Sequence, residues 1–311
     1  MSKHSAQNTA PEQYQMTETI TPWTMIRDRF SGRRALRNNL VLWAVLLTIG
    51  FFWMYPFLWV VSAAFKTSSE VFTSGPNLIP ETWLGFTNFV RAWNVANFGQ
   101  YFGNSVLYGA GSVAIALFRS ILAGYVLARF TFPGRNLIIA LVAFTVFIPV
   151  ESSVIPQFRL VNWIDKNLFS VLDTYFIVPL IQGGGGSLWV LLFMGAFRAI
   201  PHELFEAAEI DGANFWQKFR LAVPLVGPIT ATMVIFQFIG SWEDILTPII
   251  YTLGRPELRN LQSGIIAFQG ANATDWVGLA AAIVITIIPV IVLFLALQRF
   301  FIQGLAGAVK S

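Results

Sequence analysis

Cysteine is absent from this chain of 311 residues, and charged residues make up only 12% of it. Disulfides and cysteine metal sites are therefore excluded, and two histidines, His4 and His202, are too few for a histidine metal cluster. A soluble domain ordinarily carries about 25% charged residues. So little charge leaves too little polar surface to cover a soluble globule of this size, and we expect a membrane protein with no metal or cofactor of its own.

Long uncharged stretches, in a chain that is 55% hydrophobic, fill the gaps between the charges. Crossing about 30 Å of hydrocarbon takes about 20 apolar residues of helix, and each stretch is long enough. They are residues 38–65, 92–118, 174–197, 221–242 and 276–298, with a sixth at 136–158 that only Glu151 interrupts. The second yields a span at 104–128 that contains Arg119. The sequence therefore predicts an all-α integral membrane protein with about six transmembrane helices.

The ends of the chain are polar and flank this apolar region. Residues 1–38 are predicted to be a flexible cytoplasmic leader, residues 39–302 the transmembrane domain, and residues 303–311 a cytoplasmic tail. The first apolar run, 40–64, is too long and starts too late for a cleaved signal peptide, so it should remain as a span.

Basic residues set the orientation. With six spans and both termini inside, thirteen Lys and Arg lie inside and six outside, and Arg119 lies within a span, which together make the 20 in the chain. This bias favours cytoplasmic termini. It also accounts for the net charge of +4, so that binding of nucleic acid is not needed to explain that charge. The inside residues are Lys3, Arg27, Arg29, Arg33, Arg34, Arg37, Arg129, Arg135, Arg198, Lys218, Arg220, Arg299 and Lys310, and the outside ones Lys66, Arg91, Arg159, Lys166, Arg255 and Arg259.

The predicted fourth span contains four consecutive glycines, Gly183 to Gly186. Each should destabilise a helix by roughly 1 kcal/mol relative to Ala, so we expect the run to be non-helical. Non-helical backbone at membrane depth persists only where protein buries it or water lines it. Alternatively, the glycines lie at the outer interface, in a loop that leads to a tilted span.

The inner loop, residues 201–224, reads PHELFEAAEIDGANFWQKFRLAVP and predicts a helix–turn–helix. Pro201 suits the first turn of a helix, and Glu203 lies near the positive end of its dipole. Gly212 can adopt the left-handed conformation that ends such a helix. Asn214 and Gln217 have the spacing of a capping box that starts a second helix, which Pro224 should end.

Glu206-Ala207-Ala208, followed by Asp211-Gly212-Ala213 and then Pro224, resembles the EAA signature of ABC importer permeases. For that family the resemblance implies the type I importer permease fold, in which this loop docks into a separate ATPase. We call residues 201–224 the coupling loop on that basis. The residues that the resemblance assigns to ATPase coupling are Glu203, Glu206, Ala207, Ala208, Asp211, Gly212, Ala213 and Pro224. A solvated surface helix is the alternative for an arbitrary membrane protein.

The resemblance extends over nearly the whole chain after residue 50. YPFLWVVSAAFKTSSEVF, GYVLARFTFPGR, SWEDILTP and QRFFIQGLAGAVKS are similar, in this order, to segments of maltose-type sugar permeases, specifically the six-span partner of the heterodimer. Two features depart from that pattern. The interval from Gly212 to Pro224 is one residue shorter than usual, and Glu243 stands where the family commonly has Asn.

No G-x-x-x-x-G-K-[ST] loop occurs in the chain, so it lacks the usual cradle for ATP phosphates. The resemblance implies that ATP and Mg are used by a partner ATPase homodimer. It further implies a second permease subunit, an extracellular solute-binding protein, and a bacterial or archaeal plasma membrane. The solute would be a sugar or a related small polar molecule. The chain itself is not expected to be an enzyme, because it carries no cluster of catalytic type.

An ion-coupled secondary transporter is the alternative function. Such proteins carry ionisable residues within their spans, and Arg119, Glu151, Glu243 and Asp244 are candidates, but this class leaves the EAA-like loop unexplained. Arg119 and Glu151 are expected to pair inside the membrane. The candidate residues of a translocation path are Asn104, Glu151, Ser152, Trp242, Glu243 and Asp244. Hydrogen bonding between packed helices is the alternative role for each of them.

Overall fold

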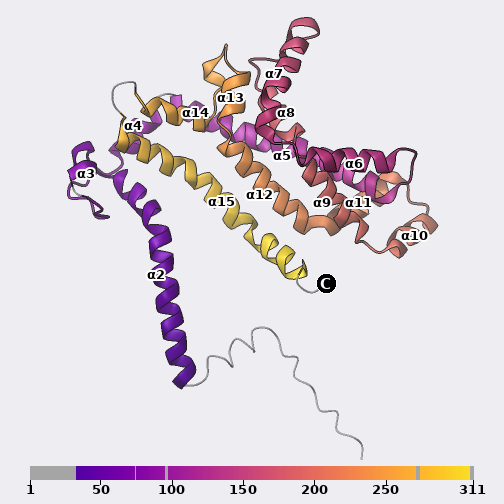
Figure 1. Cartoon of the computed structure of the whole chain (residues 1–311), viewed down its shortest axis with the longest axis horizontal. Helices are drawn as coiled ribbons and strands as arrows, with labels where there is room; N and C mark the ends of the chain where they lie inside the picture. Colours follow the sequence, from indigo (N-terminus) through magenta and orange to yellow (C-terminus); the bar gives the residue numbers. More distant parts are fainter. Residues whose placement is uncertain (1–32, 74, 95–96, 271–273, 309–311) are drawn as a thin grey trace, which may run out of the picture. The chain divides into compact units, whose positions relative to one another are not determined.

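The computed structural model describes residues 33–73, 75–94, 97–270 and 274–308. Within these ranges all the regular elements are helices. The described residues form no strand, only one isolated bridge between Gln269 and Thr274. Figure 1 labels the α-helices. They are α2 (Arg33–Ala63), α3 (Ser68–Thr73), α4 (Thr87–Asn94), α5 (Phe98–Arg129), α6 (Arg135–Thr145), α7 (Val150–Asn167), α8 (Ile177–Gly184), α9 (Ser187–Arg198), α10 (His202–Ile210), α11 (Phe215–Ala222), α12 (Gly227–Glu243), α13 (Leu246–Tyr251), α14 (Leu261–Ile265) and α15 (Trp276–Ala308).

The chain divides into two units, residues 1–58 and 59–311. The described part of the first unit is the helical segment from Arg33, so the final residues of the predicted leader, 33–38, already belong to α2. The rest of the predicted leader, residues 1–32, lies outside the described residues. At the other end α15 continues to Ala308 through most of the predicted tail, and residues 309–311 again lie outside the description.

Within the described ranges, four helical segments are long and apolar enough to cross a membrane, and a fifth is the bent pair α8 and α9. The four are 40–63, 98–129, 215–243 and 276–296. The predicted span at 136–158 is not one continuous helix, because α6 ends at Thr145 and α7 begins at Val150. Pro149 explains the break, since proline lacks an N–H and keeps the preceding residue out of the helical conformation.

Helix α5 is the centre of the second unit and contacts α8, α9 and α12 along its length. Glycines permit the close approach. A Cβ atom at Gly111 would lie 2.8 Å from the Cβ of Pro179 on α8, and one at Gly124 would lie 2.6 Å from the Cβ of Phe193 on α9. Such small-residue contacts are how helices approach in membranes, where burial from water adds no attraction between spans.

A single methyl group should therefore disturb the packing of α5 against α9. We expect Gly124→Ala to destabilise the protein by about 1–3 kcal/mol, because the added Cβ would also lie 3.0 Å from the backbone nitrogen of Met194. Gly103→Ala is the matched control on the same helix, since a Cβ there meets nothing within 4 Å. Thermal unfolding in detergent checks the pair, and equal melting temperatures would contradict the packing argument.

Candidate coupling loop and membrane interior

The coupling loop folds as the sequence predicts. Pro201 directly precedes α10, and Gly212 has a φ of +73°, the left-handed conformation that ends the helix. Asn214 and Gln217 form a reciprocal capping box at the start of α11, with N···O distances of 2.7 and 3.0 Å. Helix α11 ends at Ala222, and Pro224 lies in the 3-10 turn that leads into α12. The shortened interval before Pro224 is thus compatible with a complete second helix.

An ion pair joins the two helices of the loop. Lys218 Nζ on α11 donates to Glu209 Oε1 on α10 at 2.6 Å. This hydrogen bond holds the pKa of the Glu209 carboxyl below its ordinary value. Because the folded-state pKa is depressed, the stabilisation is complete above the unfolded-state pKa and is lost as the pH falls through the lowered value. The Glu209 carboxylate is therefore available for the ion pair at neutral pH.

The residues assigned to ATPase coupling lie together on this loop and are largely accessible. Glu203, Glu206, Ala207, Asp211, Gly212 and Pro224 are exposed, and Ala208 and Ala213 are half-buried. Two large apolar side chains share the exposed surface, Ile210 at 87% and Trp216 at 62% exposure. Glu206 accepts a hydrogen bond from the exposed His202 at 2.9 Å when that ring nitrogen carries the proton. The loop therefore presents an acidic surface with apolar side chains among the charges.

One buried tyrosine joins this loop to the transmembrane helices. Tyr125, near the end of α5, is 1% exposed and contacts rings from α9, α10 and α11. Its centroid lies 5.3 Å from that of Phe197, 6.4 Å from Phe205 and 5.1 Å from Phe219. Such aromatic pairs stabilise a packed core beyond the area that they bury. We call this group the aromatic knot, composed of Tyr125, Phe130, Phe197, Phe205, Phe215 and Phe219.

The glycine run breaks the fourth span, as predicted, but only its second half is non-helical. Helix α8 includes Gly183 and Gly184, Gly185 is extended, and Gly186 has a φ of +78°. Helices α8 and α9 meet at 54° across this break. Gly183 stays helical against α5, where its added Cβ would lie 2.6 Å from the carbonyl oxygen of Ser112.

Arg119 of α5 binds the backbone at this break. Its Nη2 atom donates to the carbonyl oxygens of Gly185 and Gly186, the latter at 3.1 Å. The carbonyls at a helix end lack partners within the helix, so a guanidinium there satisfies groups that hydrocarbon could not. The side chain of Glu151 lies outside the description. Its pairing with Arg119 therefore stays a prediction, while the observed partner of Arg119 is the broken backbone.

The candidate path residues have different surroundings. Asn104 is 4% exposed and donates to the carbonyl oxygens of Glu257 and Arg259, both at 2.8 Å. Trp242 is 1% exposed, and its indole N–H donates to the carbonyl oxygen of Thr286 on α15 at 3.0 Å. In this conformation both side chains hold segments of the chain together.

The other candidates are more accessible. Ser152 and Glu243 are exposed, and Asp244 is half-buried. Asp244 accepts from Gln182 Nε2 at 2.9 Å, and Gln182 in turn accepts from the Ser241 hydroxyl at 2.5 Å. This polar network joins α8 to the end of α12 beside the glycine break. Of its members, only Asp244 was predicted from the sequence.

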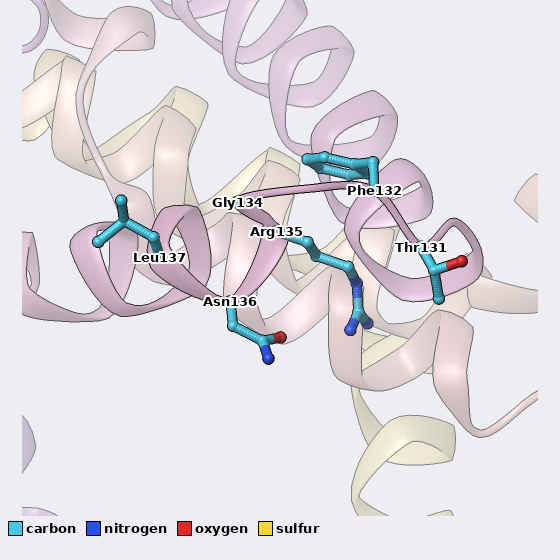
Figure 2. Close-up of a pocket in the computed structure, with 6 residues that line it drawn as sticks. All are labelled: Thr131, Phe132, Gly134, Arg135, Asn136 and Leu137. Atoms are coloured by element: carbon cyan, nitrogen blue, oxygen red, sulfur yellow. The ribbon is translucent and has the colours of Figure 1, made fainter.

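A small hollow of about 260 Å³ lies at the turn between α5 and α6 (Figure 2). Arg135 on its wall donates through Nε and Nη2 to the carbonyl oxygen of Leu127, so the guanidinium serves to close this turn. The volume falls below the roughly 300–1,000 Å³ usual for small-molecule sites. The hollow is lined by Thr131, Phe132, Gly134, Arg135, Asn136 and Leu137.

Two neighbouring glycines allow a direct test of the backbone at the break. Gly186→Ala should destabilise the protein by about 1–2 kcal/mol, because a Cβ opposes the left-handed conformation. Gly185→Ala is the matched control, since Gly185 has a φ of −76° and its added Cβ would have only an ordinary contact. The melting temperature of the detergent-solubilised protein should fall for the first variant only. A similar fall in both would contradict the assigned geometry.

Comparisons with known proteins identify the family of this chain. The profile of the family described as "Binding-protein-dependent transport system inner membrane component" matches residues 110–307. The diacetylchitobiose uptake system permease protein NgcG of Streptomyces coelicolor is 33% identical over 88% of this chain and 85% of its own length. The arabinooligosaccharides transport system permease protein AraQ of Halalkalibacterium halodurans is 34% identical over 86% of this chain and 96% of its own.

A solved structure shares the fold. It is a bacterial ABC transporter involved in the import of the acidic polysaccharide alginate, and one of its chains superposes with a TM-score of 0.74 at 22% identity. The match covers 88% of this chain and 99% of that chain. The chain therefore belongs to the family of inner membrane components of binding-protein-dependent transport systems, as a multi-pass permease subunit of an ABC importer.

Proposed function

We propose that this permease forms one half of the translocation pathway for a sugar or oligosaccharide that an extracellular binding protein delivers. The observation that carries the proposal is the agreement among relatives of similar length. Two are named for diacetylchitobiose and arabinooligosaccharides. A third, the melibiose/raffinose/stachyose import permease protein MelC of Bacillus subtilis, is 35% identical over 73% of this chain.

The second part of the proposal is that the coupling loop docks on a partner ATPase. Its support is a compact helix pair with an acidic, partly apolar exposed surface. Ile210 and Trp216 would be buried by docking, and Glu206 would face a basic residue of the ATPase. ATP and Mg then act only in the partner, an ATPase homodimer. A second permease subunit completes the pathway, so that the transporter is a heterodimer in the membrane.

Topology is the third part. We count α6 with α7 as one interrupted span, which gives six spans, and we assign both termini to the cytoplasm from the excess of basic residues there. The coupling loop then lies on the cytoplasmic side, as docking requires. Along the path we assign Ser152, Glu243 and Asp244 to the wall that faces the solute. Asn104 and Trp242 support that wall from behind, and Glu151 belongs to the same assignment.

The test is to purify the transporter with its co-purifying subunits and reconstitute it in liposomes. A panel of neutral and acidic oligosaccharides, each presented with the co-purifying binding protein, should reveal one that is taken up only when ATP is supplied. Uptake that follows a proton or sodium gradient and ignores ATP would instead support the ion-coupled alternative. No uptake of any sugar, with ATP-dependent uptake of another solute, would refute the substrate class alone.

Two substitutions in the loop test the docking assignment. Glu206→Lys should abolish uptake, because a desolvated charge pair that loses one partner destabilises a complex by about 3–5 kcal/mol. Gly212→Val should also abolish it, because a branched side chain opposes the left-handed turn. Both variants should still insert in the membrane, as fractionation would show, and fail to bind purified ATPase. Normal uptake by both would exclude this loop as the docking site.

A further inference from the structure

Arg129, in the last turn of α5, contacts both sides of the linker between α9 and α10. Its Nη2 atom donates to the carbonyl oxygen of Phe197, in the last turn of α9, at 2.5 Å, and to that of Ile200, in the linker, at 2.6 Å. Its Cζ atom lies 4.0 Å from the centroid of the Phe205 ring on α10. One side chain from a third helix therefore holds the junction on both sides.

The linker is short, and its N–H groups bond back to α9, from Ala199 to the carbonyl oxygen of Gly195 and from Ile200 to that of Phe197. Helix α9 ends at Arg198 and α10 begins at His202, and Pro201 between them has no N–H to bond. The last carbonyls of a helix lack intrahelical donors, and a cation is favoured at that end of the dipole. The guanidinium of Arg129 adds a second donor to the Phe197 carbonyl and donates to that of Ile200, and its planar face can also lie on the Phe205 ring.

Arg129 differs in role from Tyr125, which lies one turn earlier on the same face of α5. Tyr125 contacts Phe215 and Phe219 and so attaches the second helix of the loop. It would continue to attach the loop if Arg129 were replaced. Tyr125 also contacts Phe197 on α9 and Phe205 on α10, so an aromatic contact between these helices would remain. What the replacement removes is the pair of hydrogen bonds that fixes the linker itself, and with it the direction of α10 relative to α9.

The same helix also holds the other end of α9. Arg119 binds the carbonyls of Gly185 and Gly186 directly before α9 begins, and Arg129 binds the carbonyl of Phe197 where it ends. Two guanidinium groups on α5 thus bind α9, the second half of the broken span, at both of its ends. Any displacement of α10 that reaches α9 is then passed on to α5 and to the glycine break.

We propose that Arg129 is a positioning residue that fixes α10 against α9, so that movement of the coupling loop drives the broken span and is not absorbed in the linker. This inference rests on the proposed function of the loop. It predicts a specific defect. Without Arg129 the transporter should assemble and hydrolyse ATP, but most cycles should move no solute.

The experiment measures solute taken up per ATP hydrolysed, in proteoliposomes that contain the complete transporter. Arg129→Gln should lower this ratio by about fivefold or more. Fivefold is about the lower end of the range in which coupling between two sites usually changes affinity. Arg129→Lys should give an intermediate ratio, because an ammonium keeps the charge and the hydrogen bonds but not the planar stacking surface. If the Gln variant fails to assemble, the Lys variant carries the test.

Arg135→Gln is the matched control. Arg135 lies at the same end of the molecule and also binds a backbone carbonyl, that of Leu127, but this carbonyl belongs to α5 itself. Its loss should leave the uptake per ATP unchanged. If Arg135→Gln lowered the ratio as much as Arg129→Gln, the effect would be general to this end of the protein and the inference would fail.

A spectroscopic measurement distinguishes positioning from general stability. Because the chain has no cysteine, spin labels can be placed on cysteines introduced at Leu188 on α9 and Ile210 on α10, both exposed. Electron–electron distances between them should become broadly distributed in Arg129→Gln and stay narrow in Arg135→Gln. An unchanged distribution would overturn the inference, as would uptake and hydrolysis that fall together at a constant ratio. Wild-type proteoliposomes without ATP-driven uptake would instead overturn the proposed function.

Discussion

The close packing of α5 against both halves of the broken span is the constraint on which the remaining structure depends. Where α5 meets α8 and α9, Gly111, Gly183 and Gly124 leave no room for a Cβ atom. Because the backbones approach so closely, side chains of α5 can reach backbone carbonyl groups of the neighbouring helices. If the helices lay farther apart, these carbonyls would be out of reach of those side chains. Arg119 and Arg129 both use this proximity to bind carbonyl groups at the two ends of α9. The glycine break is therefore stabilised from a neighbouring helix, which explains how a non-helical segment persists within a candidate span.

The coupling loop is attached to this same helix through the aromatic knot. The knot brings α9, α10 and α11 into contact with Tyr125, a residue that is itself buried. A packed interior transmits displacement because side chains have little free volume into which to relax. A loop that moves with the ATPase would accordingly move α5 and α9 together. Energy from ATP can drive the change only if the partner binds the two states with different affinity.

Local features of the fold could be predicted from the sequence, because their causes are local. Gly212, Asn214 and Gln217 specify a turn and a cap within a few residues, and four consecutive glycines disfavour a continuous helix whatever surrounds them. The roles of Asn104 and Trp242 could not be predicted, because their partners are carbonyls more than forty residues away in the chain. Arg129 and Tyr125 were missed because their partners also lie far away in the sequence, carbonyls for Arg129 and aromatic rings for Tyr125. A dense group of aromatics at the end of a span was the available signal, but which rings meet depends on the crossing of four helices.

The central claim is that the coupling loop, as fixed by α5, is the surface on which the ATPase docks. The most direct measurement uses two exposed isoleucines, Ile210 on the coupling loop at 87% exposure and Ile79 between α3 and α4 at 81%. Each is replaced in turn by cysteine in this cysteine-free chain and labelled with a photoactivated cross-linker before the ATPase is added, and the assembled transporter is then illuminated. The account predicts an adduct with the ATPase from the label at position 210 and none from position 79. An ATPase adduct from position 79, or its absence from position 210, would contradict it.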